Sequence, residues 1–134
     1  MLVETGSEIA DFCRATQPEV GLLLDTGHAY AAGADYGEIL RRFGDRVAHI
    51  HLKDVRRDVL DWARKNDVTF NSAVRAGLFT VPGDGNVDFT EIGQFVRSSG
   101  YSGWAVVEAE QDPAKAPPRT YTEKAYQYVR NLLV

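Results

Sequence analysis

Three apolar runs of the sequence each end in a residue that can bind a metal ion. GLLLDTGH leads to Asp25, VAHIHLKD leads to His51, and WAVVEAEQD leads to Glu108. Each run has the length of a buried strand and is followed by a turn or loop and then a stretch with helical periodicity. Parallel strands buried on both faces have this continuous apolar pattern. Because chemistry collects at the carboxyl ends of such strands, we expect the three side chains to form one site.

The second run adds two further candidates on the same face of its strand. Side chains alternate with a period of two, so His49, His51 and Lys53 share that face. If it points into a barrel, His49 is a core histidine, His51 is the better metal ligand, and Lys53 reaches the rim. At the rim a lysine can neutralise an oxyanion or relay a proton.

Glu110 shares the face of Glu108 at the end of the third run. A pair of glutamates at a strand end is costly unless a cation or a proton compensates their charge. Glu108 is nearer to the expected interior and is the preferred ligand. Glu110 either supports it from outside or is itself the ligand.

Asp25, His28 and the turn at 82–85 also have ordinary explanations. An aspartate that ends a strand often hydrogen-bonds only the next turn of its own backbone, and a loop histidine is commonly a surface residue. The company of the other strand ends favours the ligand role for Asp25. We place His28 in a loop, three residues on, where it can contact a substrate. The turn is either loop chemistry alone or a rim element that shapes the pocket.

An aspartate, a histidine and one or two glutamates form a hard, oxygen-rich ligand set with one nitrogen. Such a set favours Mn²⁺, Co²⁺ or Mg²⁺ over a structural zinc ion. With an open position, the site can hold a hydroxy-ketone through two oxygens. The metal then stabilises the enediolate that forms when a nearby carboxylate removes a proton beside the carbonyl.

The composition is that of an ordinary globular protein. The 134 residues are 44% apolar and 25% charged, with a net charge of −4, which gives no electrostatic footprint for nucleic acid. No apolar stretch approaches the ~20 residues that span a bilayer, and no secretory signal is visible. The single cysteine, Cys13, excludes an internal disulfide and fits a reducing cytosol. We therefore predict a cytoplasmic protein that binds neither nucleic acid nor membrane.

Helix and strand signals alternate along the chain. Ser7 is the expected N-cap of a helix over 7–16. Later helix starts share the pattern of a capping residue followed three residues on by glutamate, at Asp35/Glu38, Asp88/Glu91 and Thr120/Glu123. The least regular stretch, 54–86, has one helical segment, DVLDWARKN. The resulting order, α-β-α-β-(loop, α)-α-β-α, predicts parallel strands joined by right-handed crossovers.

Three strands make a small parallel sheet with two raw edges, and a (β/α)₈ barrel needs about 250 residues. We therefore expect residues 1–134 to form a single domain of the α/β class, the C-terminal portion of a (β/α)₈ TIM barrel with about three β/α units. The first strands are expected to be absent. Such a chain should self-associate or bind a complementing N-terminal half-barrel.

Four segments resemble the xylose isomerase-like TIM-barrel superfamily of sugar isomerases, epimerases and dehydratases, and within it the inosose dehydratases: LLLDTGHAYAAG, HIHLKDV, VPGDGNVDF and GWAVVEAEQDPAKAPP. The likeness runs from about Gly21 to the C-terminus. It implies a metal site of Glu, Asp, His and Glu from four successive strands. Asp25, His51 and Glu108 take the last three places, and the first glutamate is expected on a strand before this chain.

The resemblance implies dehydration of scyllo-inosose (2-keto-myo-inositol) to a trihydroxycyclohexane-1,2-dione in inositol catabolism, with Mn²⁺ or Co²⁺ as the metal. Glutathione is a cofactor named for the family, although no residue here indicates a glutathione site. Glu108 or the preceding glutamate is expected to take the α-proton, and Lys53 and His28 to contact substrate oxygens. Arg57 falls where related epimerases bind substrate, with Arg56 next to it.

Two alternatives remain open. A sugar or inositol-ketone isomerase or epimerase of the same superfamily shares the enediolate and omits the elimination. A catalytically inactive half-barrel fragment is the other alternative.

Overall fold

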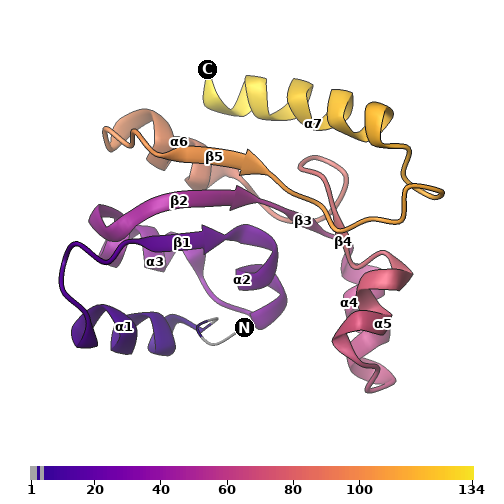
Figure 1. The fold of residues 1–134 in the computed structure, drawn as a ribbon, viewed down its shortest axis with the longest axis horizontal. Helices are drawn as coiled ribbons and strands as arrows, with labels where there is room; N and C mark the ends of the chain where they lie inside the picture. Colours follow the sequence, from indigo (N-terminus) through magenta and orange to yellow (C-terminus); the bar gives the residue numbers. More distant parts are fainter. Residues whose placement is uncertain (1–2, 4) are drawn as a thin grey trace.

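The computed structural model describes residues 3 and 5–134, and its centre is a three-stranded parallel sheet (Figure 1). The strands, in the order β1–β2–β5, are Leu22–Asp25 (β1), Val47–Leu52 (β2) and Trp104–Val107 (β5). Asp25 lies beside His51, and His51 lies beside Val106. Glu108 is two residues beyond Val106 and therefore follows the same face. The register thus brings the three strand ends to one edge, as the sequence predicted.

Helices connect the strands, and several of them cover the outer face of the sheet. They are Gly6–Ala15 (α1), Thr26–Ala32 (α2), Tyr36–Phe43 (α3), Arg57–Lys65 (α4), Phe70–Ala76 (α5), Thr90–Ser98 (α6) and Pro118–Leu133 (α7), with a 3₁₀ turn at Gly44–Arg46 (η1). In sequence order, α1 packs on α3, α3 on α6 and α6 on α7. Helices α4 and α5 pack on each other and project beyond the strand ends (Figure 1).

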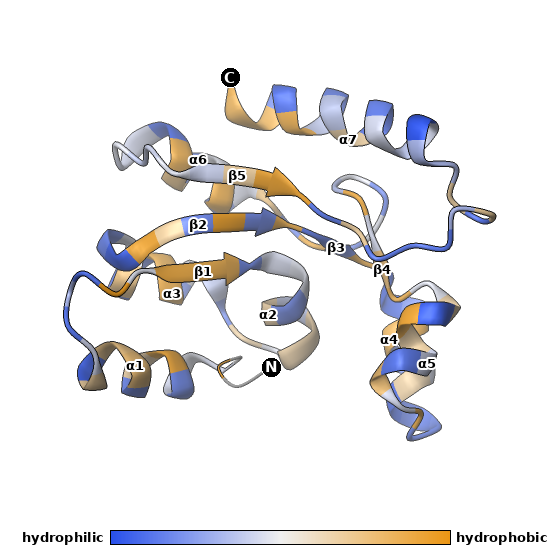
Figure 2. Ribbon diagram, in the orientation of Figure 1, coloured by the Kyte–Doolittle hydropathy of each residue, from blue (hydrophilic) through white to orange (hydrophobic). Residues whose placement is uncertain are grey.

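The hydrophobic core lies between the sheet and these outer helices. Ile50 and Leu52 of β2 are fully buried, and Ile39 of α3 and Ile92 of α6 belong to the same cluster. Figure 2 shows the hydrophobic colour concentrated along the strands, while α7 is largely hydrophilic on its outer side. Burial of one such side chain contributes about 2 kcal/mol, so the core fixes the helices to one face of the sheet.

The other face of the sheet is open. Leu23, Trp104 and Val106 lie on it and are 53%, 76% and 37% exposed. Within the described residues, β1 and β5 each pair only with β2. This apolar face corresponds to the side that a closed barrel turns inward.

The irregular stretch 54–86 has more structure than the sequence indicated. Asp54–Val55 (β3) and Phe79–Thr80 (β4) form a short antiparallel ribbon, and α5 lies between them in sequence. The predicted helix is α4. The sequence did not predict the two short strands, because two-residue strands carry no readable periodicity. It also did not predict α5, which is only seven residues long.

Three predicted helix starts were wrong by a few residues. Thr5, not Ser7, caps α1: its side chain accepts from the Glu8 amide, and the Glu8 carboxylate accepts from the Thr5 amide. Helix α6 begins at Thr90, whose amide donates to the Asp88 side chain. Helix α7 begins at Pro118, so Thr120 lies inside it. Proline suits the first helical position because its missing N–H would have no partner there.

Candidate metal and substrate site

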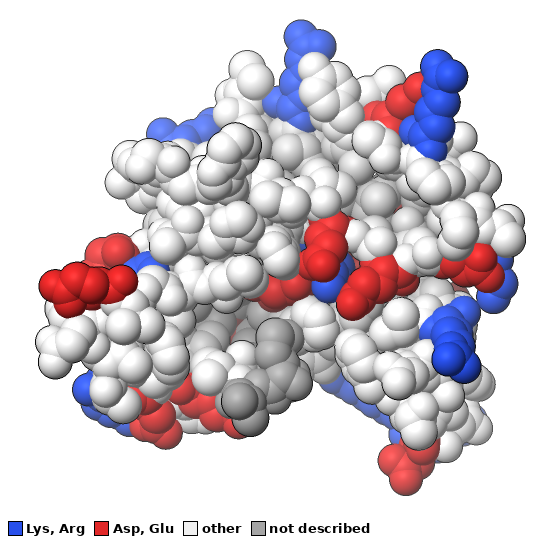
Figure 3. Space-filling view, in the orientation of Figure 1, with Lys and Arg blue, Asp and Glu red and all other residues white. Residues whose placement is uncertain are grey.

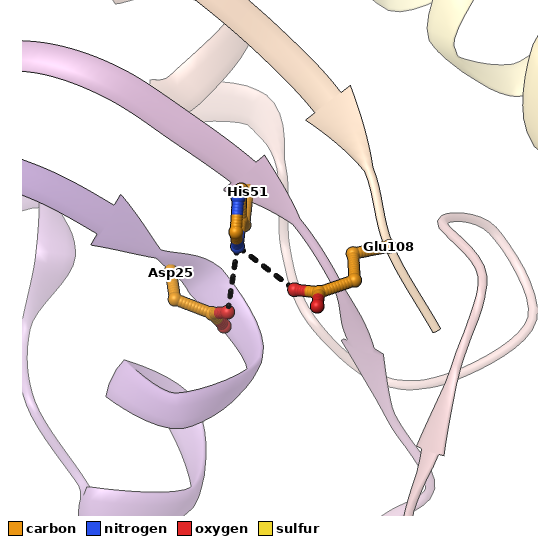
Figure 4. Close-up of side chains that lie close together, drawn as sticks. All are labelled: Asp25, His51 and Glu108. Carbon is orange, nitrogen blue, oxygen red and sulfur yellow. Dashed lines mark ion pairs between the residues drawn. The ribbon is translucent and has the colours of Figure 1, made fainter. Parts of the chain in front are cut away.

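Asp25, His51 and Glu108 converge at the carboxyl ends of the three strands (Figure 4). The His51 Nδ1 atom is 2.8 Å from Glu108 Oε2 and 3.5 Å from Asp25 Oδ2. One potential ligand atom from each residue lies within 4.8 Å of the others. Two carboxylates and an imidazole at this separation can bind one divalent cation with small side-chain rotations. We call these three residues the metal triad.

Asp25 caps the following helix and also lies beside the other site residues. Its Oδ1 atom accepts from the His28 amide at 3.0 Å and so caps α2, while Oδ2 faces His51 and Lys53. The cap starts a helix directly after the strand, so our placement of His28 in a loop was wrong. His28 lies in the first turns of α2.

Lys53 is buried against the carboxylates instead of reaching a solvated rim. The residue is 1% exposed, and its Nζ atom lies 3.1 Å from Glu108 Oε2, 3.3 Å from Glu110 Oε2 and 3.4 Å from Asp25 Oδ2. Figure 3 shows acidic side chains gathered around a basic one beyond the strand ends. Burial alone would lower the pKa of Lys53, but the three carboxylates outweigh it and raise this pKa above 10.5. Lys53 is therefore a cationic hydrogen-bond donor and not a base at neutral pH.

The start of α2 fixes the backbone and stem of Lys53. The Thr26 hydroxyl donates to the Lys53 carbonyl at 2.7 Å and accepts from the Lys53 amide at 2.9 Å. A Cβ on Gly27 would lie 2.7 Å from Lys53 Cγ, so only glycine lets the helix pack this closely. The Thr-Gly pair after Asp25 thus positions the lysine, a role that the sequence alone did not reveal.

Three aromatic rings adjoin the triad on the lysine side. The His28 ring lies 5.0 Å from the Phe79 ring and 5.8 Å from the Phe70 ring, between centroids. Lys53 Nζ lies 4.7 Å from the Phe79 centroid. Phe70 and Phe79 were not predicted as site residues because both come from the irregular stretch. Their only signal in the sequence was their aromatic character.

Arg57 and His49 lie farther from the triad. The Arg57 guanidinium lies over the Tyr30 ring, 5.5 Å from its centroid, and has no ion pair with the triad in the described structure. Arg56 pairs with Asp84 at 2.7 Å. The substrate-binding role of Arg57 therefore stays a prediction. His49 is half-buried, and its ring meets His51 edge-on at 5.1 Å.

The Asp54 carboxylate fixes the turn at 82–85. It accepts hydrogen bonds of 2.8–3.0 Å from the amides of Val55, Gly83, Gly85 and Val87. A Cβ on Gly85 would lie 2.4 Å from Asp54 Oδ1, so a side chain there would displace the carboxylate. We call Asp54 and these amides the Asp54 clasp.

Hydrogen bonds also link the turn at 82–85 to the segment that carries Glu108 and Glu110. Asp84 pairs with Arg56 and Lys124 and accepts from Thr80 at 2.6 Å. Burial raises the pKa of Asp84, but the hydrogen bonds from Lys124, Thr80 and Arg56 outweigh it, so this pKa is lowered. Gln111, next to Glu110, donates to the Thr80 hydroxyl at 3.0 Å. The turn is thus part of the framework beside the site.

The fold and site match one known family. The family model described as xylose isomerase-like TIM barrel matches residues 1–132. The chain belongs to this family. It is a partial barrel of the xylose isomerase-like type, which confirms the fold class predicted from the sequence.

Several relatives of this xylose isomerase-like chain are inosose dehydratases. The chain is 48% identical to the inosose dehydratase of Geobacillus kaustophilus over 133 residues, which cover 98% of the chain and 43% of that protein. It is 47% identical to the rhizopine catabolism protein MocC of Rhizobium meliloti, covering 94% of the chain and 39% of that protein. The chain thus spans less than half the length of the relatives it matches.

Solved structures share the fold of this chain. One is that of the IolI protein with a bound zinc atom, with a TM-score of 0.68 and 17% identity, and covers 97% of this chain and 44% of that one. A xylose isomerase-like TIM barrel/4-hydroxyphenylpyruvate dioxygenase fusion protein gives a TM-score of 0.57 with 24% identity, covering 82% and 16% of the two chains. In residues 3 and 5–134, no helix is long and apolar enough to cross a membrane.

Proposed function

We propose that this chain is the metal-binding part of a hydro-lyase that converts scyllo-inosose to a trihydroxycyclohexane-1,2-dione. The observation that carries the proposal is the 48% identity to inosose dehydratases over a segment that contains the whole metal triad. The IolI neighbour supports the same fold and is a zinc-binding protein by its description. The reaction, its substrate and its place in inositol catabolism are our proposal for the complete protein.

The charges of the site fit a divalent cation. Three carboxylates, from Asp25, Glu108 and Glu110, surround the single ammonium of Lys53. With His51 neutral, two negative charges are left unbalanced, and a divalent cation would neutralise them. Asp25, His51 and Glu108 would hold it, and we propose Mn²⁺ or Co²⁺ from the oxygen-rich ligand set. When bound, the ion would polarise the ketone and the neighbouring hydroxyl of the substrate.

Each step of the elimination can be assigned to a residue of the site. Glu108, or a glutamate from the part of the relatives that this chain does not span, takes the proton from the carbon beside the ketone. The hydroxyl of the next carbon leaves as water after it accepts a proton, and Lys53 is the cationic donor that faces it. His28 contacts a substrate oxygen. The enol that remains tautomerises to the dione, so only water is lost.

The open sheet face and the free edges support a complementing partner. We propose that the face carrying Leu23, Trp104 and Val106 packs against an N-terminal half-barrel, in the same polypeptide or another, or against a second copy. That partner segment would supply the fourth ligand. If residues 1–134 alone had the mass of a monomer in solution and unfolded in a single two-state transition, the proposal of a partner would be contradicted. Glutathione dependence and a cytoplasmic location stay predictions.

Product analysis tests the proposed reaction. The natural protein that carries this chain is stripped of metal, reloaded with Mn²⁺ or Co²⁺, and incubated with scyllo-inosose. We expect the dione with one water lost per turnover, and no product from the His51→Gln variant, while His49→Gln stays active. A ketone with an altered stereocentre would instead identify an epimerase. No turnover with either metal, in a folded and metal-loaded protein, would reject the dehydratase proposal.

A further inference from the structure

Phe70 is a half-exposed aromatic ring beside the polar end of the site. It is the first residue of α5 and is 53% exposed. Its ring lies nearly parallel to the His28 ring, at 24°, and 6.0 Å from the Phe79 ring. Because Phe79 is fully buried, the part of this cluster that solvent reaches belongs to Phe70 and His28.

This aromatic cluster is continuous with the metal triad. Lys53 Nζ lies over the Phe79 ring and also pairs with Asp25 and Glu108. The His28 amide donates to Asp25. A ligand whose oxygens reach Lys53 and the triad therefore meets aromatic carbon at its side, because Phe79 adjoins Lys53 and Phe70 adjoins Phe79.

We propose that Phe70 is a specificity-determining residue, and that one face of the substrate ring packs against the aromatic wall that the exposed Phe70 ring forms beside His28. The inference rests on the proposed function. In scyllo-inosose every hydroxyl is equatorial, so each ring face presents only axial C–H bonds. Such a face is apolar and suits the negative face of an aromatic ring. An isomer with an axial hydroxyl would press a polar group against the wall without a hydrogen-bond partner.

Trp62 is a matched control. It is a large aromatic residue on the adjacent helix α4, is 44% exposed, and its ring contacts neither Phe70 nor Phe79 in the described structure. Loss of either side chain removes a similar exposed apolar area. Only Phe70, however, lies against a ring that adjoins the triad.

The kinetic test uses Phe70→Ala, Phe70→Tyr and Trp62→Ala in the natural, metal-loaded protein. Phe70→Ala is expected to raise KM for scyllo-inosose about fivefold, the scale of one lost aromatic contact, with a smaller change in kcat. The preference over an inosose with one axial hydroxyl should fall. Phe70→Tyr keeps the ring and should restore both values, and Trp62→Ala should match the parent. Identical KM and preference in Phe70→Ala and Trp62→Ala would overturn the inference.

A binding test separates this inference from the proposed reaction. Scyllo-inositol has the same all-equatorial hydroxyls but no ketone to react. With Mg²⁺ present, irradiation of aromatic protons should transfer saturation to its axial ring protons in the parent and in Trp62→Ala, and the transfer should fall by at least half in Phe70→Ala. If this result is obtained but scyllo-inosose is not turned over, the dehydratase proposal is rejected and the role of Phe70 stands. No transfer in the parent, or equal transfer in Phe70→Ala, would overturn the role of Phe70.

Discussion

Two carboxylate clusters near Lys53 are satisfied in opposite ways. The Asp54 clasp gives one buried carboxylate four backbone N–H donors from its own chain. In the second cluster, the three carboxylates of the triad and Glu110 share one ammonium, that of Lys53, and one imidazole, that of His51. The first cluster is complete, and its purpose is to fix a turn. The second leaves negative charge that a cation can neutralise, which is what distinguishes a site from a structural carboxylate.

The clasp should dominate stability. Asp54→Ala leaves four amides without their acceptor, two of them on the buried residues Val55 and Val87. We expect it to lower the free energy of unfolding by about 4 kcal/mol, at roughly 1 kcal/mol for each lost hydrogen bond. Asp54→Asn keeps one acceptor oxygen and should lose about half as much. Urea unfolding of both variants measures the loss. A loss for Asp54→Ala below that of an exposed-site control such as Asp11→Ala would show that the clasp is not structural.

The triad should dominate metal binding instead. Asp25→Asn keeps an oxygen that can cap α2 but loses the charge, so Mn²⁺ affinity should fall at least about a hundredfold, while stability without metal changes by about 1 kcal/mol or less. Asp35→Asn is the matched control, because Asp35 caps α3 through the Glu38 amide away from the triad. Calorimetric titration gives both affinities. Equal Mn²⁺ uptake by the parent and Asp25→Asn would remove Asp25 from the ligand set.

Lys53 should give the triad a measurable pH dependence. Lys53→Met leaves three carboxylates without their ammonium, and should cost about 2 kcal/mol of stability in metal-free protein at pH 7. Because the folded pKa of Lys53 is raised above 10.5, its contribution is present below pH 10.5 and is lost as pH rises through the folded value. Unfolding curves of parent and variant from pH 7 to 11 measure this difference. A difference that disappears below pH 9 would contradict the raised pKa.

The smallest effect distinguishes the two glutamates. Glu108 lies within the triad, whereas among the described residues the Glu110 carboxylate pairs with Lys53 alone. Glu108→Gln should weaken Mn²⁺ binding about tenfold or more, and Glu110→Gln about threefold or less. Calorimetric titration of the two variants compares them. The reverse order would make Glu110 the ligand.

Local patterns in the sequence were enough to predict that the three triad residues lie close together. Continuous apolar runs identified the strands. Side-chain alternation placed His49 and His51 on one face, and the position of His51 nearer the carboxyl end of the strand favoured it as the ligand. The clasp was not predictable in this way, because Asp54 meets amides about thirty residues later in a turn whose path depends on tertiary packing. The same limit applies to Thr26, which contacts Lys53 across two elements, and to Phe70, whose helix lies in a stretch without clear periodicity.

Pulsed electron paramagnetic resonance of bound Mn²⁺ tests the central claim most directly, because it detects a nitrogen ligand at the ion. The protein should bind one Mn²⁺ with a nitrogen modulation that is retained in His49→Gln and lost in His51→Gln. His49 is the closest control available, since its ring contacts His51 on the same strand face. A modulation that survives in His51→Gln, or that vanishes in His49→Gln instead, would contradict a metal site built from Asp25, His51 and Glu108.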